Sequence, residues 1–354
     1  MKSAGTKAAL AWACLSLWGL AWAGSGQPAC PLAWGVALDG YPVNAVAIDR
    51  ARGETGLVPK LVVFFLQWPA PDGPQEFPDS SIAAIARSGA LPCLTWEPMY
   101  HDPQGREVMV SEQELLSGRY DAYLIGFARA AAAWGRPLIV RLAHEMNLAR
   151  YHWGTEADRY GPGSPAIYRR MHRYVVDLCR REGARNLLWA FCPNAEPNPH
   201  PRWHNASWNT SAAYYPGPDY VDIMGMDGYN WGTTQTKARQ GWDSRWQSFR
   251  QTFGELRDEL SALAPEKPLI VFETASAGQG GERANWLREA LGDAAVWRIR
   301  ALVWFQVDKE VDWRLLKDRD GSALELLGQA ARCQGEPLSE LIAARDQSAL
   351  SERR

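Results

Sequence analysis

The feature that most constrains the fold is a series of eight short apolar segments, each rich in residues that favour β-strands. Most of these segments are continuously apolar instead of alternating between apolar and polar residues, which is typical of strands buried on both faces of a parallel sheet. We expect strands at Ala33–Leu38, Leu61–Trp68, Ala90–Glu97, Pro137–Asn147, Asn186–Asn194, Val221–Asn230, Pro268–Ala277 and Ile299–Asp308.

Segments with the apolar spacing of helices lie between most of these strands. The longest, Ser111–Trp134, begins with Ser111 and has Glu114 three residues later, the spacing of a capping box. The connection Asp39–Lys60 has weak helical character, and we expect it to be irregular. Other helices are expected at Ser81–Arg87, Ile167–Arg181, Trp242–Leu263, Glu282–Val296 and Ala323–Arg332. Eight strands that alternate with helices predict an α/β fold of the (β/α)8 TIM barrel type, as a single domain.

The length and net charge of the chain limit the classes of function that it can have. A chain of 354 residues, 46% of them hydrophobic, is long enough for one large core. The net charge is −2 and no basic patch dominates, which argues against nucleic acid as a partner. Eighteen tryptophans are many for this length. They are either large core residues or exposed indoles that stack on the apolar faces of sugar rings.

The N-terminus has the pattern of a secretory signal. Lys2 and Lys7 flank the apolar stretch Ala8–Ala23, and the sequence Ala-Trp-Ala before Gly24 fits a cleavage site. We therefore expect a signal peptide at 1–23, cleavage after Ala23, a catalytic domain at 24–333 and a tail at 334–354. The alternative is an uncleaved anchor, although the run is short for a transmembrane helix. The mature protein is expected to be secreted or periplasmic, monomeric and without a membrane span.

The cysteines do not suggest a metal site. Without Cys14 in the signal, an odd number of cysteines remains, so at least one thiol stays free or pairs between chains. The five that remain are Cys30, Cys93, Cys179, Cys192 and Cys333. Cys93 and Cys192 lie in apolar strand-like runs and are expected to be core residues. No Cys/His spacing resembles a zinc site, and we expect no metal and no cofactor.

Two of the predicted strands end in a lone glutamate, Glu145 and Glu273. A carboxyl group is costly at the end of a buried strand unless it is paired or used. In a barrel both would lie at the C-terminal ends of the strands, where a pair of carboxylates can hydrolyse a glycosidic bond. The alternative for either one alone is an ordinary ion pair.

Side-chain alternation makes a further prediction for the strand that carries Glu145. If the strand continues to Asn147, then Arg141, Ala143, Glu145 and Asn147 share one face. Arg141 would lie deeper in the barrel than Glu145, as a supporting residue whose positive charge keeps a neighbouring carboxylate ionised.

Four motifs occur in order over residues 60 to 315. They are His144-Glu-Met-Asn147, Met224-Gly-Met-Asp-Gly-Tyr-Asn230, Phe272-Glu-Thr-Ala-Ser276 and Val303-Trp-Phe-Gln-Val-Asp-Lys-Glu-Val-Asp-Trp313. Together they resemble glycoside hydrolase family 26, which includes endo-β-mannanases and some mixed-linkage β-glucanases and β-xylanases. The resemblance implies a (β/α)8 barrel that hydrolyses a polysaccharide or oligosaccharide by a retaining, double-displacement mechanism without a metal.

The resemblance also implies roles for individual residues. Glu145 corresponds to the acid/base and Glu273 to the nucleophile. His144 is similar to the histidine that helps place the glycone-side sugar, and Tyr229 to the tyrosine that hydrogen-bonds the nucleophile. Trp304 is similar to the indole under the sugar at the cleavage point.

Other residues of the expected site have more than one interpretation. Asn147 belongs to the first motif and is expected to contact substrate, and Trp153 follows it in a segment expected to line the cleft. Trp96, which precedes Glu97 at the end of the third strand, either lines the cleft or packs in the core. Asp227 either orients the turn after the sixth strand, as a supporting residue, or touches substrate.

The sequence departs from the family pattern after the acid/base. Leu148 and Arg150 replace a glycine and an aromatic residue, which would change a sugar-binding platform. Arg150 either meets an anionic or substituted sugar or is a solvated loop residue. The resemblance implies β-mannan as the first expected substrate, while the departure at these two positions favours the alternative, a β-glucan or a bacterial exopolysaccharide. A second alternative is a non-catalytic barrel that binds polysaccharide.

The segment Pro193–Asp219, after the fifth strand, is expected to be a long functional loop. Its Trp203 and Trp208 are either distal sugar platforms or residues that pack the loop.

Overall fold

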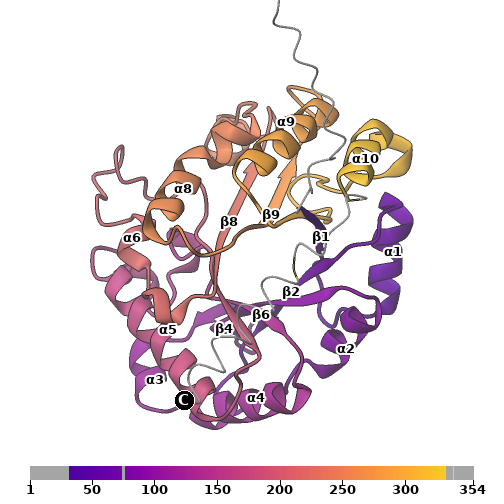
Figure 1. Ribbon diagram of the computed structural model, residues 1–354. Helices are drawn as coiled ribbons and strands as arrows, with labels where there is room; N and C mark the ends of the chain where they lie inside the picture. Colours follow the sequence, from indigo (N-terminus) through magenta and orange to yellow (C-terminus); the bar gives the residue numbers. More distant parts are fainter. Residues whose placement is uncertain (1–31, 74–75, 332–337, 339–354) are drawn as a thin grey trace, which may run out of the picture.

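The computed structural model describes residues 32–73, 76–331 and 338 of the chain. The predicted signal peptide, Cys30, Cys333 and nearly all of the predicted tail lie outside the described residues. Eight parallel strands form a closed barrel in the order β1, β10, β9, β8, β7, β6, β3, β2 (Figure 1). The barrel strands are β1 (Ala33–Ala37), β2 (Leu61–Gln67), β3 (Leu91–Glu97), β6 (Leu138–Leu142), β7 (Leu187–Phe191), β8 (Ile223–Asn230), β9 (Leu269–Ser276) and β10 (Ala301–Phe305). The predicted (β/α)8 barrel is confirmed.

Helices surround the barrel as an outer ring (Figure 1). The α-helices are α1 (Ala45–Thr55), α2 (Asp79–Arg87), α3 (Glu112–Leu116), α4 (Asp121–Trp134), α5 (Ser164–Arg181), α6 (Ser211–Tyr214), α7 (Lys237–Gln240), α8 (Phe249–Leu263), α9 (Arg283–Val296) and α10 (Lys317–Ala331). Short 3-10 turns occur at η1 (Ala149–Tyr151), η2 (Ala157–Arg159) and η3 (Pro218–Tyr220). None of the helices formed by the described residues is long and apolar enough to cross a membrane.

The structure corrects the sequence prediction for three helical segments. The first crossover is a helix, α1, because the Asn44 side chain caps its N-terminus and Gly56, at φ 73°, ends it. The segment Ser111–Trp134 contains two helices, since Gly118 has a φ of 83° and interrupts it, although the predicted capping box at Ser111 is present. The segment Trp242–Leu263 becomes helical only at Phe249, after a second capping box.

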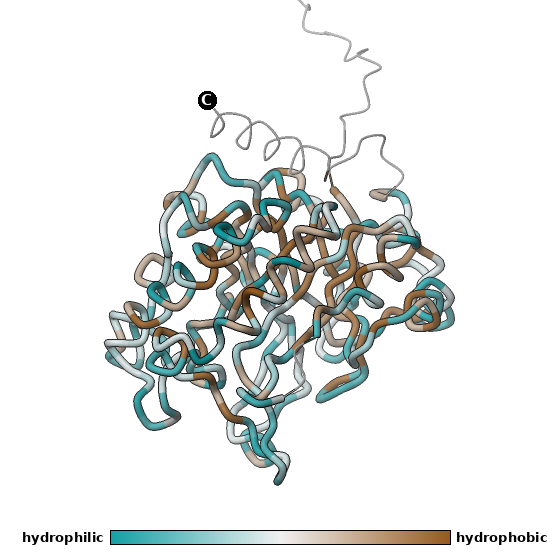
Figure 2. Tube along the Cα trace, turned by 90° about the horizontal axis from the view of Figure 1, so that it is seen from below, coloured by the Kyte–Doolittle hydropathy of each residue, from teal (hydrophilic) through white to brown (hydrophobic). Residues whose placement is uncertain are grey.

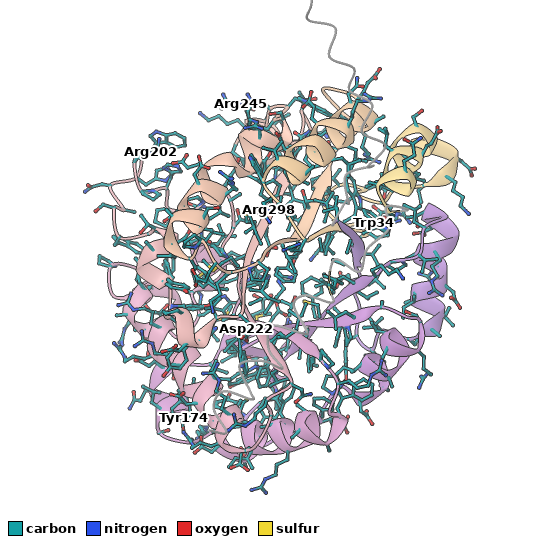
Figure 3. All side chains as sticks on the ribbon, viewed as in Figure 1. Trp34, Tyr174, Arg202, Asp222, Arg245 and Arg298 are labelled. Atoms are coloured by element: carbon teal, nitrogen blue, oxygen red, sulfur yellow. The ribbon has the colours of Figure 1, made fainter. Side chains whose placement is uncertain are left out.

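The loop after β7 is more ordered than expected. Pro193–Asp219 contains the one-turn helix α6, and η3 begins at its end. Arg202, in the middle of this loop, lies at the edge of the molecule in Figure 3. Its neighbour Trp203 is 75% exposed and stacks one face on His200, with ring centroids 3.9 Å apart. Loop packing therefore does not bury Trp203, whereas Trp208 packs against Tyr160.

The core is one continuous cluster that joins the barrel to its helices. Hydrophobic segments run through the middle of the molecule, and hydrophilic ones predominate on its projecting loops (Figure 2). Strands β1 and β2 approach closely at Gly35, where a Cβ atom would lie 2.8 Å from the Leu61 carbonyl oxygen. Cys93, Cys179 and Cys192 are buried free thiols, which confirms the core assignment of Cys93 and Cys192.

Candidate active site

A cleft of about 590 Å³ opens at the C-terminal ends of the barrel strands. Both predicted catalytic glutamates line it, as do His144 and Tyr229. A small antiparallel hairpin that follows β3, formed by β4 (Met99–His101) and β5 (Glu107–Met109), contributes to its wall. The other lining residues are Asp39, Gly40, Tyr41, Phe65, Leu66, Gln67, Glu97, Met99, Glu107, Arg150, Tyr151, Trp231, Phe305, Lys309, Glu310 and Trp313.

Glu145 does not lie on a regular strand. Strand β6 ends at Leu142, and Ala143 and Glu145 adopt left-handed backbone conformations with φ of 49° and 50°. The prediction that alternation continues from Arg141 to Asn147 is therefore wrong beyond Leu142. The backbone N–H of Glu145 donates to the Cys192 carbonyl at 2.8 Å. Two non-glycine residues in this rare conformation are costly, and such strain is concentrated at functional sites.

The Glu145 carboxylate has one hydrogen-bond partner among the described residues, Asn194. The Asn194 amide, just past β7, donates to Oε1 of Glu145 at 2.6 Å. Asn147 holds Asn194 in place, because its side-chain amide donates to the Asn194 carbonyl at 2.8 Å and its Oδ1 accepts the Asn194 N–H at 2.9 Å. Asn147 is 2% exposed and acts through Asn194, which corrects its predicted contact with substrate. Asn194 was missed by sequence reasoning, and no spacing pattern pointed to it.

Glu273 has stronger partners than Glu145. It lies within β9, and Arg141 donates from Nη1 to its Oε1 at 2.7 Å. The Tyr229 hydroxyl donates to Oε2 at 2.7 Å. Arg141, which is fully buried, also forms an ion pair with the buried Asp227 and donates to Thr95 at 2.8 Å. The predicted deep cation is present, and Asp227 contacts this cation and does not line the cleft.

Burial changes the pKa of several titratable groups that line the cleft. Burial, reinforced by the negative charge of Glu273, raises the pKa of Glu145 to about 7, while Asn194 and Arg141 act in the opposite direction. Glu145 is therefore partly protonated at neutral pH. Burial also raises the pKa of Glu97 to about 7, again with a contribution from Glu273. Burial, with help from Arg141 and Arg150, lowers the pKa of His144 well below its usual value and keeps the ring neutral.

None of the three tryptophans predicted to bind sugar lines the cleft. Trp304 is fully buried on the outer side of β10, where it packs against Trp286 and donates to the Trp313 carbonyl at 2.8 Å. Trp96 is fully buried and stacks on Phe127 of α4 at 4.1 Å. Both indoles face the helix layer, so the cleft-lining interpretation is wrong for them.

Trp153 supports the cleft wall from behind. It is 2% exposed, and its indole N–H donates to the His144 carbonyl at 2.6 Å. Its ring stacks on Tyr151, with centroids 5.1 Å apart and planes within 5°. Tyr151 in turn lies 4.9 Å from the His144 ring. Trp153 therefore positions His144 and Tyr151, and Tyr151 is the residue that reaches the cleft.

The aromatic residues that do line the cleft were mostly missed. Trp313 and Phe305 pack against Tyr229 at 5.2 and 5.7 Å, and Trp231 packs against Trp313 at 4.9 Å. Phe65 packs edge-on against Phe305, with ring centroids 6.4 Å apart. Trp313 and Phe305 belong to the quoted motif that begins at Val303, so the motif was informative although the wrong indole was chosen.

Arg150 has a partner within the cleft wall. Its guanidinium donates two hydrogen bonds to Glu107 of the hairpin, at 2.6 and 2.7 Å. This pair connects η1 to β5. The Arg150 side chain is nevertheless 53% exposed, so Arg150 is a solvated residue at the edge of the cleft, and an anionic sugar would have to compete with Glu107 for it.

The chemistry of the charged cluster favours an internal cation over a bound metal. Donor atoms of His144, Asp227 and Glu273 lie within 4.8 Å of one another. The guanidinium of Arg141 already contacts both carboxylates of this group. A metal ion at this position would have to displace a buried arginine that neutralises the same two groups.

The chain resembles several known proteins. The family model described as glycosyl hydrolase family 26 matches residues 121–244. Endoglucanase H of Acetivibrio thermocellus is 34% identical over 236 residues, which cover 66% of this chain and 23% of that protein. A mannan endo-1,4-beta-mannosidase of Bacillus subtilis is 30% identical over 152 residues, 42% of this chain and 33% of that protein. The chain thus spans about a quarter to a third of the length of these relatives.

Solved structures share the fold. A Bacillus subtilis mannanase has a TM-score of 0.56 at 16% identity, with 84% of this chain and 87% of that chain covered. A modular endo-beta-1,4-mannanase from Cellulomonas fimi has a TM-score of 0.56 at 19% identity, with 86% of this chain and 71% of that chain covered. At this level of identity the likeness supports the barrel.

Proposed function

We propose that this chain is a secreted, retaining endo-glycosidase of glycosyl hydrolase family 26 that hydrolyses a β-linked polysaccharide. The observation that carries the proposal is the contrast between the two cleft glutamates. Glu145 is buried with a pKa raised to about 7, and Glu273 is hydrogen-bonded by Arg141 and Tyr229. One group suited to donate a proton beside another held by cationic and hydroxyl donors is the arrangement that a double displacement needs.

In the first step, Glu273 attacks the anomeric carbon while the protonated Glu145 gives its proton to the leaving oxygen. The glycosidic C–O bond breaks, and a covalent ester forms between the sugar and Glu273. In the second step, the Glu145 carboxylate takes a proton from a water molecule whose oxygen attacks the same carbon. The bond to Glu273 breaks, and two inversions give net retention of configuration.

The surrounding residues fit these roles. Arg141 and Tyr229 orient the Glu273 oxygens and stabilise its negative charge before attack and after release. Asn194 orients Glu145 and also moderates its pKa, since a hydrogen bond to the carboxylate favours the ionised form. His144 is neutral and lines the cleft, so it offers a ring nitrogen to a sugar hydroxyl without adding charge.

We take β-mannan as the first candidate substrate, because the relatives include mannan endo-1,4-beta-mannosidases and a solved Bacillus subtilis mannanase has a similar barrel. A β-glucan is the second candidate. It is favoured by the match to Endoglucanase H, which extends over 66% of this chain, and by the change at Leu148 and Arg150. Secretion is supported by the N-terminal sequence, and N-terminal sequencing of the exported protein, with Gly24 first, would test it.

The experiment that tests the proposal is reducing-sugar release from galactomannan, glucomannan, mixed-linkage glucan, xylan and acidic exopolysaccharides. Wild type, Glu145→Gln and Glu273→Gln would be compared on each polymer. Hydrolysis of at least one polymer that both variants lose is the expected result. Binding without hydrolysis of any polymer would instead favour the non-catalytic polysaccharide-binding barrel. The anomer first released, followed by NMR, tests retention.

A further inference from the structure

Glu97 differs from the other carboxyl groups buried around the cleft. It is the last residue of β3, lines the cleft and is only 6% exposed. Glu145 accepts a hydrogen bond from Asn194, and Glu273 accepts from Arg141 and Tyr229. For the Glu97 carboxyl, by contrast, the part of the chain that the structure describes supplies no hydrogen-bond donor.

The side chain of Glu97 points to the inner side of the barrel. Thr95 lies two residues earlier on the same strand and accepts a hydrogen bond from the buried Arg141. Residues two apart on a strand share a face, so Glu97 lies on the face of Arg141 and Glu273. Trp96, between them, faces the helix layer. The carboxyl group therefore faces the same space as the two catalytic glutamates.

Among the described residues, the potential donors near Glu97 form no hydrogen bond with it. Arg150 is close enough for its charge to act on Glu97, but it donates both hydrogen bonds to Glu107. Gln67 is the register partner of Glu97 on β2, and its side-chain oxygen bonds to His101 at 2.9 Å. The Tyr151 hydroxyl is within electrostatic range of Glu97, Glu145 and Glu273, yet within the described ranges it hydrogen-bonds to none of them.

A buried carboxyl group without a donor is unfavourable, and almost all such groups in proteins have a partner. The cost is explained if a ligand supplies the partner. Sugar hydroxyls are O–H donors carried on a rigid ring, and a carboxyl group can accept from two of them. The opening between Glu97, Tyr151 and the catalytic pair has the polar groups that such a ring edge requires.

We propose that Glu97 binds a hydroxyl group of the sugar that lies beside Glu145 and Glu273, and that it thereby selects which β-linked sugar the cleft accepts. This inference rests on the proposed glycosidase function and adds a specificity-determining residue to it. Glu97 contributes no proton to the reaction. It contributes binding that only a sugar with a hydroxyl at the matching position can use, and such a site rejects an analogue that lacks the hydroxyl.

The test uses mannotetraose, cellotetraose and a mixed-linkage glucotetraose with the full-length protein. The tetraose cleaved fastest would then be compared with analogues in which single hydroxyls of the sugars flanking the cleaved bond are removed. Glu97→Gln and Glu97→Leu are expected to lower kcat/KM on the intact tetraose by about tenfold to a hundredfold, mainly through KM. On one deoxy analogue the variants and wild type should differ by less than about twofold, because the contact is already absent.

Stability provides an independent measurement. Glu97→Leu removes an unpartnered buried carboxyl group, so its melting temperature is expected to equal or exceed that of wild type. Glu289→Gln, which removes an exposed carboxyl group from α9, is the matched control for loss of charge. A purely structural Glu97 would instead give a lower melting temperature and the same loss of activity on every analogue. That result, or no loss on the intact tetraose, would overturn the inference.

Failure of the inference can be distinguished from failure of the proposed function. If wild type cleaves none of the tetraoses, calorimetric binding of the same three sugars replaces the rate measurement. Binding that Glu97→Gln weakens by tenfold or more would support the sugar contact without catalysis. If Glu97→Gln binds the sugars as tightly as wild type, the proposed role of Glu97 is overturned but binding of sugars by the cleft is not. If wild type neither cleaves nor binds any of the three sugars, both proposals are overturned.

Discussion

The C-terminal ends of β6 and β9 present the same residue type in opposite surroundings. At β9 the strand continues past Glu273 to Ser276, although its pairing shifts register beside Phe272, and the two oxygens of Glu273 accept from a buried arginine and a tyrosine. At β6 the strand stops three residues before Glu145, which occupies a left-handed backbone conformation and accepts from one neutral amide. Glu273 is therefore held by a cationic donor and a hydroxyl donor, whereas the donor to Glu145 is a neutral amide.

We propose that the hydrogen-bond partners of the two carboxyl groups determine which glutamate is the acid/base and which is the nucleophile. Residue type alone does not distinguish the two positions, because both are glutamates near the C-terminal end of a barrel strand. The guanidinium of Arg141 contacts Glu273, and only its longer-range field reaches Glu145. Burial without a cationic partner then raises the pKa of Glu145. Each prediction below changes one side of this contrast.

The largest effect is expected from Glu273→Gln. An amide at this position cannot attack the anomeric carbon, so polysaccharide hydrolysis should fall by about ten-thousandfold or more. Initial rates of reducing-sugar release measure it. Glu289→Gln should retain the wild-type rate. If Glu273→Gln kept a tenth of the wild-type activity, Glu273 would not be the nucleophile.

A somewhat smaller effect is expected from Glu145→Gln, and it should depend on the leaving group. Loss of a general acid costs about a hundredfold to ten-thousandfold on a polysaccharide, whose leaving oxygen needs a proton. The leaving group of a 2,4-dinitrophenyl glycoside needs no such proton, so the rate of the first step, seen as a burst of dinitrophenolate, should change by less than about tenfold. Burst rates from stopped-flow absorbance decide between these outcomes. Equal losses on both substrates would mean that Glu145 does not act as an acid.

Arg141→Leu should mainly affect stability. It leaves Asp227 and Glu273 buried without their cation, which typically costs about 3–5 kcal/mol of unfolding free energy. Urea unfolding followed by tryptophan fluorescence measures it. Arg170→Leu breaks a half-exposed ion pair with Glu112 and should cost no more than about 1 kcal/mol. If both variants lost about 1 kcal/mol or less of unfolding free energy, Arg141 would not be needed to stabilise the buried carboxylates of Asp227 and Glu273.

The smallest effect is expected from Asn194→Ala, which removes the amide donor from Glu145. That donor favours the ionised carboxylate, so its loss should raise the pKa of Glu145 above the wild-type value of about 7. The acid form then survives to higher pH, and the alkaline limb of kcat/KM should shift upward. Asn285→Ala, on the surface of α9, should leave the limb unchanged. A downward shift would contradict the assigned role of Asn194.

Much of this contrast could be predicted from the sequence, and the reason is physical. Continuous apolar runs predicted the barrel strands, and the two lone glutamates at strand ends predicted a shared site. Arg141 could be predicted as a deep cation because it lies four residues before Glu145 in the same apolar segment, although strand β6 ends between them. The helix α1 was missed because its apolar spacing is weak. Its ends are marked instead by the capping residues Asn44 and Gly56.

The orientation of the tryptophans could not be predicted. A strand buried on both faces has no polar residues to mark which side is inner, so Trp304 and Phe305 were equally plausible on the cleft side. The structure places Trp304 outward and Phe305 inward. Asn194 could not be predicted for a different reason, since its contact with Glu145 depends on β6 ending early at Leu142.

The most direct test of the contrast is to trap the intermediate. The protein would be incubated with 2,4-dinitrophenyl 2-deoxy-2-fluoro-glycosides of mannobiose and cellobiose, and the labelled peptide would be identified by mass spectrometry. The account predicts one attached sugar per chain, bound through an ester to Glu273, with Glu145 unmodified. A label on Glu145, or turnover of the natural substrate with inversion and no label, would contradict the central claim.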